Sequence, residues 1–266
     1  MSEQRVQVEK RDQVAVVTLS RPEKRNALDP AMFDALDEAA RELAADRALR
    51  AVVLAGAGKS FCAGIDLGAF AGGEAVIRKL LARREGEAAN LAQRGGWGWR
   101  ECPVPVIAAL HGEVFGGGLQ VALGADLRIA RPDAKLSIME VRWGIIPDMS
   151  GSQTLRGLVR RDVALELAWT GRIVPGDEAL ALGLVTRLAD DPLAAALATA
   201  ETIAAHSPDA VRGIKRLFNR AWECDSREAL ALEAELQMKI LGQSNHMEAM
   251  RAGLSGGTPN FGPARE

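Results

Sequence analysis

The chain has few of the residues from which metal centres and disulfide frameworks are built. It contains three cysteines and three histidines, all widely separated along 266 residues. An odd number of scattered cysteines provides no paired disulfide framework. Because these residues also lack the spacing of a zinc site, we predict no metal centre. Nothing local indicates a catalytic cysteine–histidine pair.

Long apolar runs and an excess of charge of either sign are also absent. No segment approaches the roughly 20 consecutive apolar residues that span a bilayer. The polar start MSEQRVQVEKRDQ has no apolar signal core. These features predict a cytoplasmic protein without membrane contact. The net charge of −2 gives no general attraction to nucleic acid, so we predict no nucleic-acid partner.

The sequence does contain short β-branched runs that alternate with helical patterns. Residues 14–19, 51–55 and 106–110 are typical of buried strands. Asp29 and Pro30 have the order of an N-cap and a first helical residue, so a helix is expected to begin there. Parallel strands need crossovers, which helices supply, and the alternation therefore predicts an α/β fold.

Two segments depart from this alternation. Residues 68–99 are rich in Gly, Ala and Arg, and we interpret them as a mobile wall of a binding site with a helical middle section. Beyond residue 190 the helical pattern dominates. Three helices are expected at 194–205, 208–222 and 227–241, followed by an extended tail at 253–266. We divide the chain into a core, residues 1–190, and a C-terminal helical region for oligomerisation, residues 191–266.

Three consecutive glycines, residues 116–118, join a strand pattern to a helical pattern that begins near Leu119. Glycine suits a tight helix entry because it adopts positive φ without steric cost. The uncovered N–H groups at a helix N-terminus carry partial positive charge. Such a turn can hold a developing oxyanion. The alternative is a tight turn that only allows close backbone packing.

Four segments together carry a family resemblance. They are RPEKRNAL (21–28), FCAGIDL (61–67), HGEVFGGGLQ (111–120) and MEVRWGIIPD (139–148). In order and spacing they resemble the crotonase superfamily, also called the enoyl-CoA hydratase/isomerase family, and the resemblance covers most of the chain. It implies a spiral of repeated β-β-α units with a helical C-terminal region that builds a homotrimer or a dimer of trimers.

The resemblance also implies an acyl-CoA thioester substrate. Coenzyme A would enter as part of that substrate, and no further cofactor is expected. In the family, two backbone N–H groups hold the thioester oxygen, and the matching donors here are those of Ile65 and Gly117. The residues that the resemblance places along the CoA path are Arg25, Ala27, Lys59, Ala63, Asp66 and Leu67. Arg25 and Lys59 would lie near the phosphates, although a solvated surface charge is the alternative for each.

The residues at the two positions where hydratases of the family carry glutamates indicate which reaction is favoured. Hydratases of the family use two glutamates; the first position is Gln120 here, and the second matches Glu140. An amide can orient water but cannot take up a proton at neutral pH. We therefore expect Glu140 to be the acid/base and favour double-bond isomerisation over hydration. Trp143 is expected either to line the acyl pocket or to lie in the core.

A second acid, Asp148, follows Pro147 eight residues after Glu140. A Glu and an Asp at this spacing resemble dienoyl-CoA isomerases. The Pro-Asp pair also resembles 3-hydroxyisobutyryl-CoA hydrolases, and aroyl-CoA dehalogenases use an Asp here as nucleophile. Asp148 is thus a catalytic candidate, with an N-cap for a helix near Met149 as the alternative. Hydrolysis, dehalogenation and CoA binding without turnover all stay open, the last because of Gln120.

Overall fold

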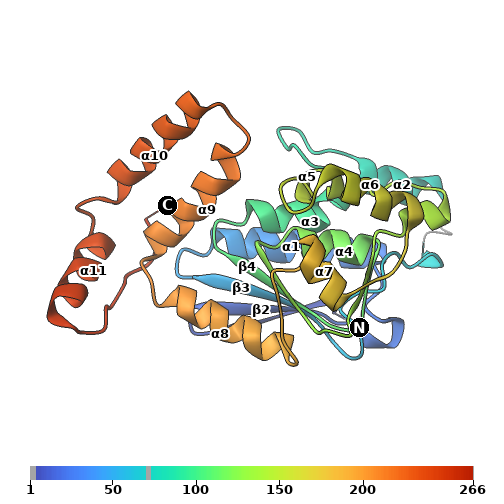
Figure 1. The fold of residues 1–266 in the computed structure, drawn as a ribbon, viewed down its shortest axis with the longest axis horizontal. Helices are drawn as coiled ribbons and strands as arrows, with labels where there is room; N and C mark the ends of the chain where they lie inside the picture. The colour runs from blue at the N-terminus through green and yellow to red at the C-terminus, as the bar shows by residue number, and fades with distance from the viewer. Residues whose placement is uncertain (1–3, 70–72, 266) are drawn as a thin grey trace.

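A computed structural model describes residues 4–69 and 73–265 and shows two β-sheets surrounded by helices (Figure 1). The larger sheet contains, in spatial order, β1 (Val6–Arg11), β2 (Val14–Leu19), β3 (Ala51–Gly56), β4 (Val106–Leu110), β6 (Leu127–Ala130) and β9 (Arg187–Leu188). The pair β1–β2 is antiparallel, and the remaining pairs are parallel. The smaller sheet has the order β5 (Glu113–Phe115), β7 (Lys135–Ser137) and β8 (Val174–Pro175). The predicted α/β fold is confirmed.

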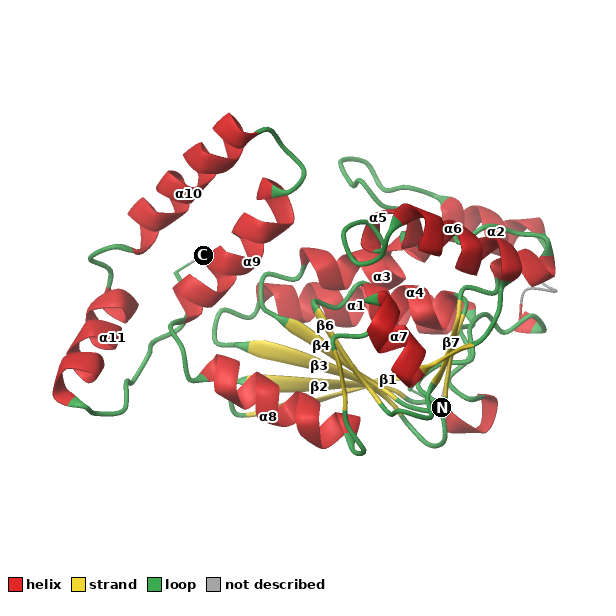
Figure 2. Ribbon diagram, in the orientation of Figure 1, coloured by secondary structure: helices red, strands yellow, loops and turns green. Residues whose placement is uncertain are grey.

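Helices cover both faces of the larger sheet (Figure 2). Those within the first 190 residues are α1 (Pro30–Ala45), α2 (Glu74–Leu81), α3 (Leu91–Glu101), α4 (Gly117–Leu123), α5 (Gly151–Thr154), α6 (Arg161–Thr170) and α7 (Gly176–Leu182), with 3-10 turns η1 (Pro22–Lys24) and η3 (Glu140–Trp143). Helices α1, α3 and α4 lie on one face, and α8 (Pro192–Ala204) lies on the other.

Strand β2 shows why the apolar runs are continuous. Val14 and Val16 belong to the apolar cluster beneath α8, while Ala15, Val17 and Leu19 belong to the cluster beneath α1 and α3. A strand covered on both faces buries every side chain, so it lacks the alternation of a half-exposed strand. The predicted strands at 14–19, 51–55 and 106–110 are confirmed.

Helix α1 begins where its capping residues predict. The Asp29 side chain accepts a hydrogen bond from Met32 N at 2.8 Å, and Pro30 is the first helical residue. This satisfies one of the N–H groups that have no partner within the first helical turn.

The helical middle section predicted within residues 68–99 is confirmed by α2 and α3, the mobile wall stays a prediction, and residues 70–72 lie outside the described part of the chain. Trp99 is fully buried. A Cβ atom on Gly96 would lie 2.5 Å from the backbone oxygen of Gln120, and one on Gly124 would overlap the backbone oxygen of Gly96. The glycines of α3 therefore permit close packing on α4, which outweighs their low helix propensity.

The C-terminal region begins with α8 against the sheet and continues as an arm that extends away from the core (Figure 1). The arm contains α9 (Pro208–Ala221), α10 (Ser226–Ile240) and α11 (Ser244–Ser255). The three predicted helices are confirmed as α8, α9 and α10, whereas α11 was not predicted, and only its residues 253–255 fall within the predicted extended tail. The division after residue 190 stays a prediction. No helix within residues 4–69 and 73–265 is both long and apolar enough to cross a membrane.

Candidate active site

The triple-glycine turn connects β5 to α4. Gly116 has a φ of +50°, a conformation that side chains rarely adopt, and its N–H donates to Ser137 O at 2.9 Å. A Cβ atom on Gly117 would lie 2.8 Å from the Met149 sulfur, and one on Gly118 would lie 2.5 Å from the backbone oxygen of Cys62. The turn is therefore packed too closely for side chains, as the packing alternative predicted, and it also leaves a helix N-terminus open.

The segment that contains Ile65 lies beside this turn. Backbone hydrogen bonds join Ala63 N to Arg25 O at 2.9 Å and Leu28 N to Gly64 O at 2.7 Å. A Cβ atom on Gly64 would lie 3.8 Å from Gly117 N, so the two predicted oxyanion donors come from adjacent backbones. Among the described residues, neither the Ile65 N–H nor the Gly117 N–H donates a hydrogen bond.

Gln120 and Glu140 meet side by side in the interior. Gln120 Nε2 donates a hydrogen bond of 2.6 Å to Glu140 Oε1. The other end of the amide, Gln120 Oε1, accepts hydrogen bonds from Met149 N at 2.9 Å and Gly151 N at 3.0 Å. Because two backbone donors hold the amide oxygen, the NH₂ group must face the carboxylate. Gln120 therefore orients Glu140 and cannot itself act as a base.

The second carboxylate oxygen of Glu140 has no hydrogen-bond partner among the described residues. Glu140 is 4% exposed, and its Oε2 is buried. Burial raises the pKa of Glu140, the Gln120 hydrogen bond lowers it in part, and the charge of Asp148 adds to the increase. A buried carboxyl with a raised pKa and one unpaired oxygen has the properties of a group that exchanges protons with a bound molecule.

Asp148 is half-buried, and burial raises its pKa. It does not have the N-cap role that was the alternative, because α5 begins at Gly151 with Ser150 at the N-cap position. Its charge acts on Glu140 through space, so the two acids are electrostatically coupled.

Four of the predicted CoA-path residues lie in two paired backbone segments, and Lys59 and Leu67 lie outside that pairing. The backbone pairing of residues 25–28 with residues 63–66 brings Arg25, Ala27, Ala63 and Asp66 to one edge of the site. Asp66 accepts a hydrogen bond of 2.7 Å from Arg21. This bond is the main reason that the pKa of Asp66 lies below its usual value. Lys59 and Leu67 are exposed, as is the Arg25 side chain.

Sequence reasoning assigned no role to Asn26, which holds this edge together. It is fully buried with a φ of +57°. Its Nδ2 donates to the backbone oxygens of Ala57, Ser60 and Phe61, and its Oδ1 accepts from Arg21 N at 2.8 Å. Asparagine tolerates left-handed backbone conformations better than most residues. The Asn at position 26 was therefore the sequence feature that could have indicated a tight turn here.

Trp143 is 58% exposed, so its interpretation as a core residue is wrong. Ile145 and Ile146, which follow it, are exposed as well. Together they form an apolar surface on the segment that leads from Glu140 to Asp148.

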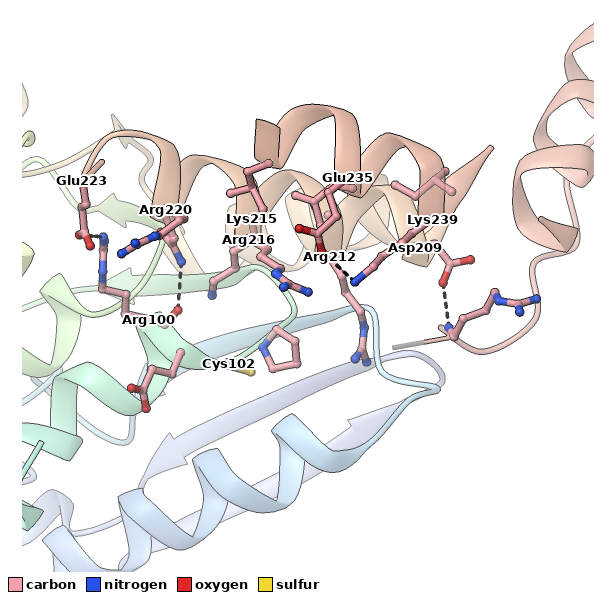
Figure 3. Close-up of a pocket in the computed structure, with 18 of the residues that line it drawn as sticks. Arg100, Cys102, Asp209, Arg212, Lys215, Arg216, Arg220, Glu223, Glu235 and Lys239 are labelled. Atoms are coloured by element: carbon pink, nitrogen blue, oxygen red, sulfur yellow. Dashed lines mark hydrogen bonds and ion pairs between the residues drawn. The ribbon is translucent and has the colours of Figure 1, made fainter. Parts of the chain in front are cut away.

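A cavity of about 1050 Å³ lies elsewhere, between α3 and the arm helices α9 and α10 (Figure 3). Its charged side chains are largely paired, as in the contacts of Arg100 with Glu223 at 2.8 Å and of Lys215 with Asp126 at 2.7 Å. The residues that line it include neither Glu140 nor the other predicted site residues. The cavity is therefore separate from the candidate active site.

Comparison with known proteins agrees with these features. The sequence profile of the enoyl-CoA hydratase/isomerase family matches residues 9–262. A probable enoyl-CoA hydratase from Mycobacterium tuberculosis is 33% identical over 264 residues, which cover 98% of this chain and 99% of the relative. The mitochondrial Delta(3,5)-Delta(2,4)-dienoyl-CoA isomerase of Rattus norvegicus is 35% identical over 250 residues, which cover 90% of this chain and 75% of the relative.

The fold comparison gives the same result. The crystal structure of an enoyl-CoA hydratase from Bacillus anthracis matches with a TM-score of 0.90 at 30% identity, covering 97% of this chain and 99% of that chain. The predicted crotonase-like fold is thereby confirmed. The family profile extends over nearly the whole chain, and the chain therefore belongs to the enoyl-CoA hydratase/isomerase family.

Proposed function

We propose that this enzyme, which acts on an acyl-CoA, moves a carbon–carbon double bond along the acyl chain, with Glu140 as the acid/base. The observation that carries the proposal is that the two carboxylate oxygens of Glu140 have different surroundings. Gln120 holds Oε1, and the buried Oε2 has no hydrogen-bond partner in the part of the chain that the structure describes. An Oε2 in this state can remove a proton from one carbon of a bound thioester and return it to another.

The negative charge that develops on the thioester oxygen needs stabilisation. We assign this role to the N–H groups of Ile65 and Gly117, which lie close together and donate no hydrogen bond within the described residues. Losing one such donor typically costs about 2.7–4 kcal/mol in the transition state. We further propose that Arg25 and Lys59 contact the CoA phosphates and that Ala27, Ala63, Asp66 and Leu67 line the path of the CoA moiety.

Gln120 is the reason to prefer isomerisation over hydration. Water addition needs a group to activate the water while the acyl carbon is protonated. The amide of Gln120 cannot take up a proton, so of these two hydrogen-bonded side chains only Glu140 can act as an acid or a base. We place Asp148 as a second acid that raises the pKa of Glu140 and that could return the proton at a more remote carbon.

A panel of 2-enoyl-, 3-enoyl- and dienoyl-CoA thioesters of different lengths tests the reaction. We expect bond migration, followed by the ultraviolet absorbance of the conjugated thioester, to exceed water addition, followed by mass spectrometry. Water addition without migration would contradict isomerisation. Release of free CoA with a covalent acyl adduct on Asp148 would indicate hydrolysis, release of halide from a halogenated aroyl-CoA would indicate dehalogenation, and tight binding without any turnover would indicate a binding protein.

We also propose a homotrimer or a dimer of trimers, built through the arm. Ile214 and Phe218 on α9 and Trp222 at its C-cap form an exposed stripe at helical spacing, and Trp222 is 73% exposed. Apolar stripes of this size on a soluble chain mark interaction surfaces. A further set of exposed apolar side chains lies on α11 and comprises Met247, Met250 and Leu254.

Light scattering coupled to size-exclusion chromatography tests the assembly. The double variant Phe218→Asp/Trp222→Asp is expected to weaken subunit association by roughly a hundredfold or more, because two large apolar side chains that the proposed interface would bury become charged. Arg227→Glu, a charge reversal at an exposed position of α10, serves as the control and should leave the oligomer unchanged. A wild-type chain that is already monomeric would contradict the proposal.

A further inference from the structure

Glu113, the first residue of β5, carries a carboxylate with no part in the reaction proposed above. Its Oε1 accepts a hydrogen bond of 2.9 Å from Arg25 Nη1. Its Oε2 accepts a hydrogen bond of 3.0 Å from Ser60 Oγ. Because both oxygens are held by different partners, the carboxylate has a fixed orientation toward the turn that contains Arg25.

Arg25 is presented to solvent from a rigid support. Its backbone is left-handed, with a φ of +50°, and its side chain is 63% exposed. The next residue, Asn26, ties this turn to the loop that carries Lys59 and Ser60. A guanidinium has five N–H donors, of which the Glu113 contact uses one. The remaining donors leave Arg25 able to bind a second anion.

Two effects of Glu113 on that second anion oppose each other. The carboxylate orients the guanidinium, but exposed ion pairs contribute little, so the benefit of orientation is small. The same carboxylate also repels any anion that reaches Arg25, and this repulsion grows with the charge of the anion. For a phosphate group, which carries up to two negative charges, the repulsion is the larger effect.

We propose that Glu113 is a specificity-determining residue that weakens the binding of CoA phosphate at Arg25. Less of the binding energy for an acyl-CoA then comes from the nucleotide and more from the pantetheine and acyl portions. The enzyme accordingly discriminates less between thioesters with and without the nucleotide. This inference rests on the proposed function, because it takes the anion at Arg25 to be a phosphate of the substrate.

Titration calorimetry with free CoA and with pantetheine, which lacks the phosphates, tests this role in the full-length protein. Glu113→Gln removes the charge and keeps a hydrogen-bonding side chain. We expect it to tighten CoA binding by about fivefold and to steepen the salt dependence, while pantetheine binding is unchanged. The KM for an enoyl-CoA should fall by the same factor. Glu23→Gln is the matched control, because Glu23 lies on the same turn but pairs with Arg21, at 3.7 Å.

The outcomes separate this inference from the proposed reaction. Unchanged or weaker CoA binding in Glu113→Gln would show that Glu113 only supports the turn, and would overturn the inference. So would an Arg25→Met variant that binds CoA as tightly as the wild type, although the proposed isomerisation would then still stand. A wild-type protein that neither binds nor converts any acyl-CoA would overturn the proposed function, and the inference with it.

Discussion

The variant Glu140→Gln is expected to lower kcat/KM for double-bond migration by about a thousandfold, within the range for loss of a positioned acid/base. Glutamine has the size of glutamate, and its amide oxygen can still accept the hydrogen bond from Gln120. The change therefore removes proton transfer at Oε2 with little disturbance of the interior. Stopped-flow absorbance of a 3-enoyl-CoA, together with exchange of substrate hydrogens in deuterated water, measures the loss.

Two further measurements make this result interpretable. The affinity for CoA should be unchanged, because Glu140 lies at the acyl end of the proposed site. Glu38→Gln, at an exposed carboxylate on α1, should retain wild-type activity. Full activity of Glu140→Gln on every enoyl-CoA and dienoyl-CoA of the panel would refute the assignment of Glu140 as the base.

The parts of the fold that could be predicted are those that local chemistry determines. Asp29 and Pro30 mark the start of α1 because a cap acts within one helical turn. Strand β2 was predictable because burial on both faces leaves a continuous apolar run. Helix α11 was not predicted because no capping side chain marks its start: Gln243 is at the N-cap position and makes no side-chain cap hydrogen bond.

In the candidate site, too, only the features that depend on local sequence could be predicted. The glycine turn and the acid at position 140 were identifiable from their motifs. The orientation of the Gln120 amide was not, because it depends on Met149 N and Gly151 N, roughly thirty residues further along the chain. Likewise, the three carbonyl contacts of Asn26 belong to a loop that is distant in sequence. Contacts of this kind follow from the packing of separate elements, which no local pattern encodes.

The variant Gln120→Glu is expected to change how the carboxyl group of Glu140 ionises, and to do so without unfolding the protein. Met149 N and Gly151 N would continue to hold one oxygen of the new carboxylate. The other oxygen would then face Glu140 Oε1, where Gln120 Nε2 now lies at 2.6 Å. Two carboxylates this close cannot both ionise readily, so they share a proton and titrate as a pair.

The consequence is a shift in the pH dependence of catalysis. In the wild type, burial already raises the pKa of Glu140, and activity rises with pH as this base loses its proton. Sharing a proton raises the second ionisation of the pair further, so the rising limb of the profile should move upward by about two pH units. Activity at a pH on the original limb should accordingly fall by roughly a hundredfold and recover at higher pH.

A pH–rate profile of kcat/KM for the isomerisation, with water addition followed in parallel, measures the shift. Gln153→Glu is the matched control, because Gln153 is exposed on the neighbouring helix α5 and the substitution adds the same charge without facing Glu140. An unchanged profile would mean that the amide does not face Glu140. Water addition that appears only in Gln120→Glu would show that the residue at position 120 selects between bond migration and hydration, because a second carboxylate can activate water and an amide cannot.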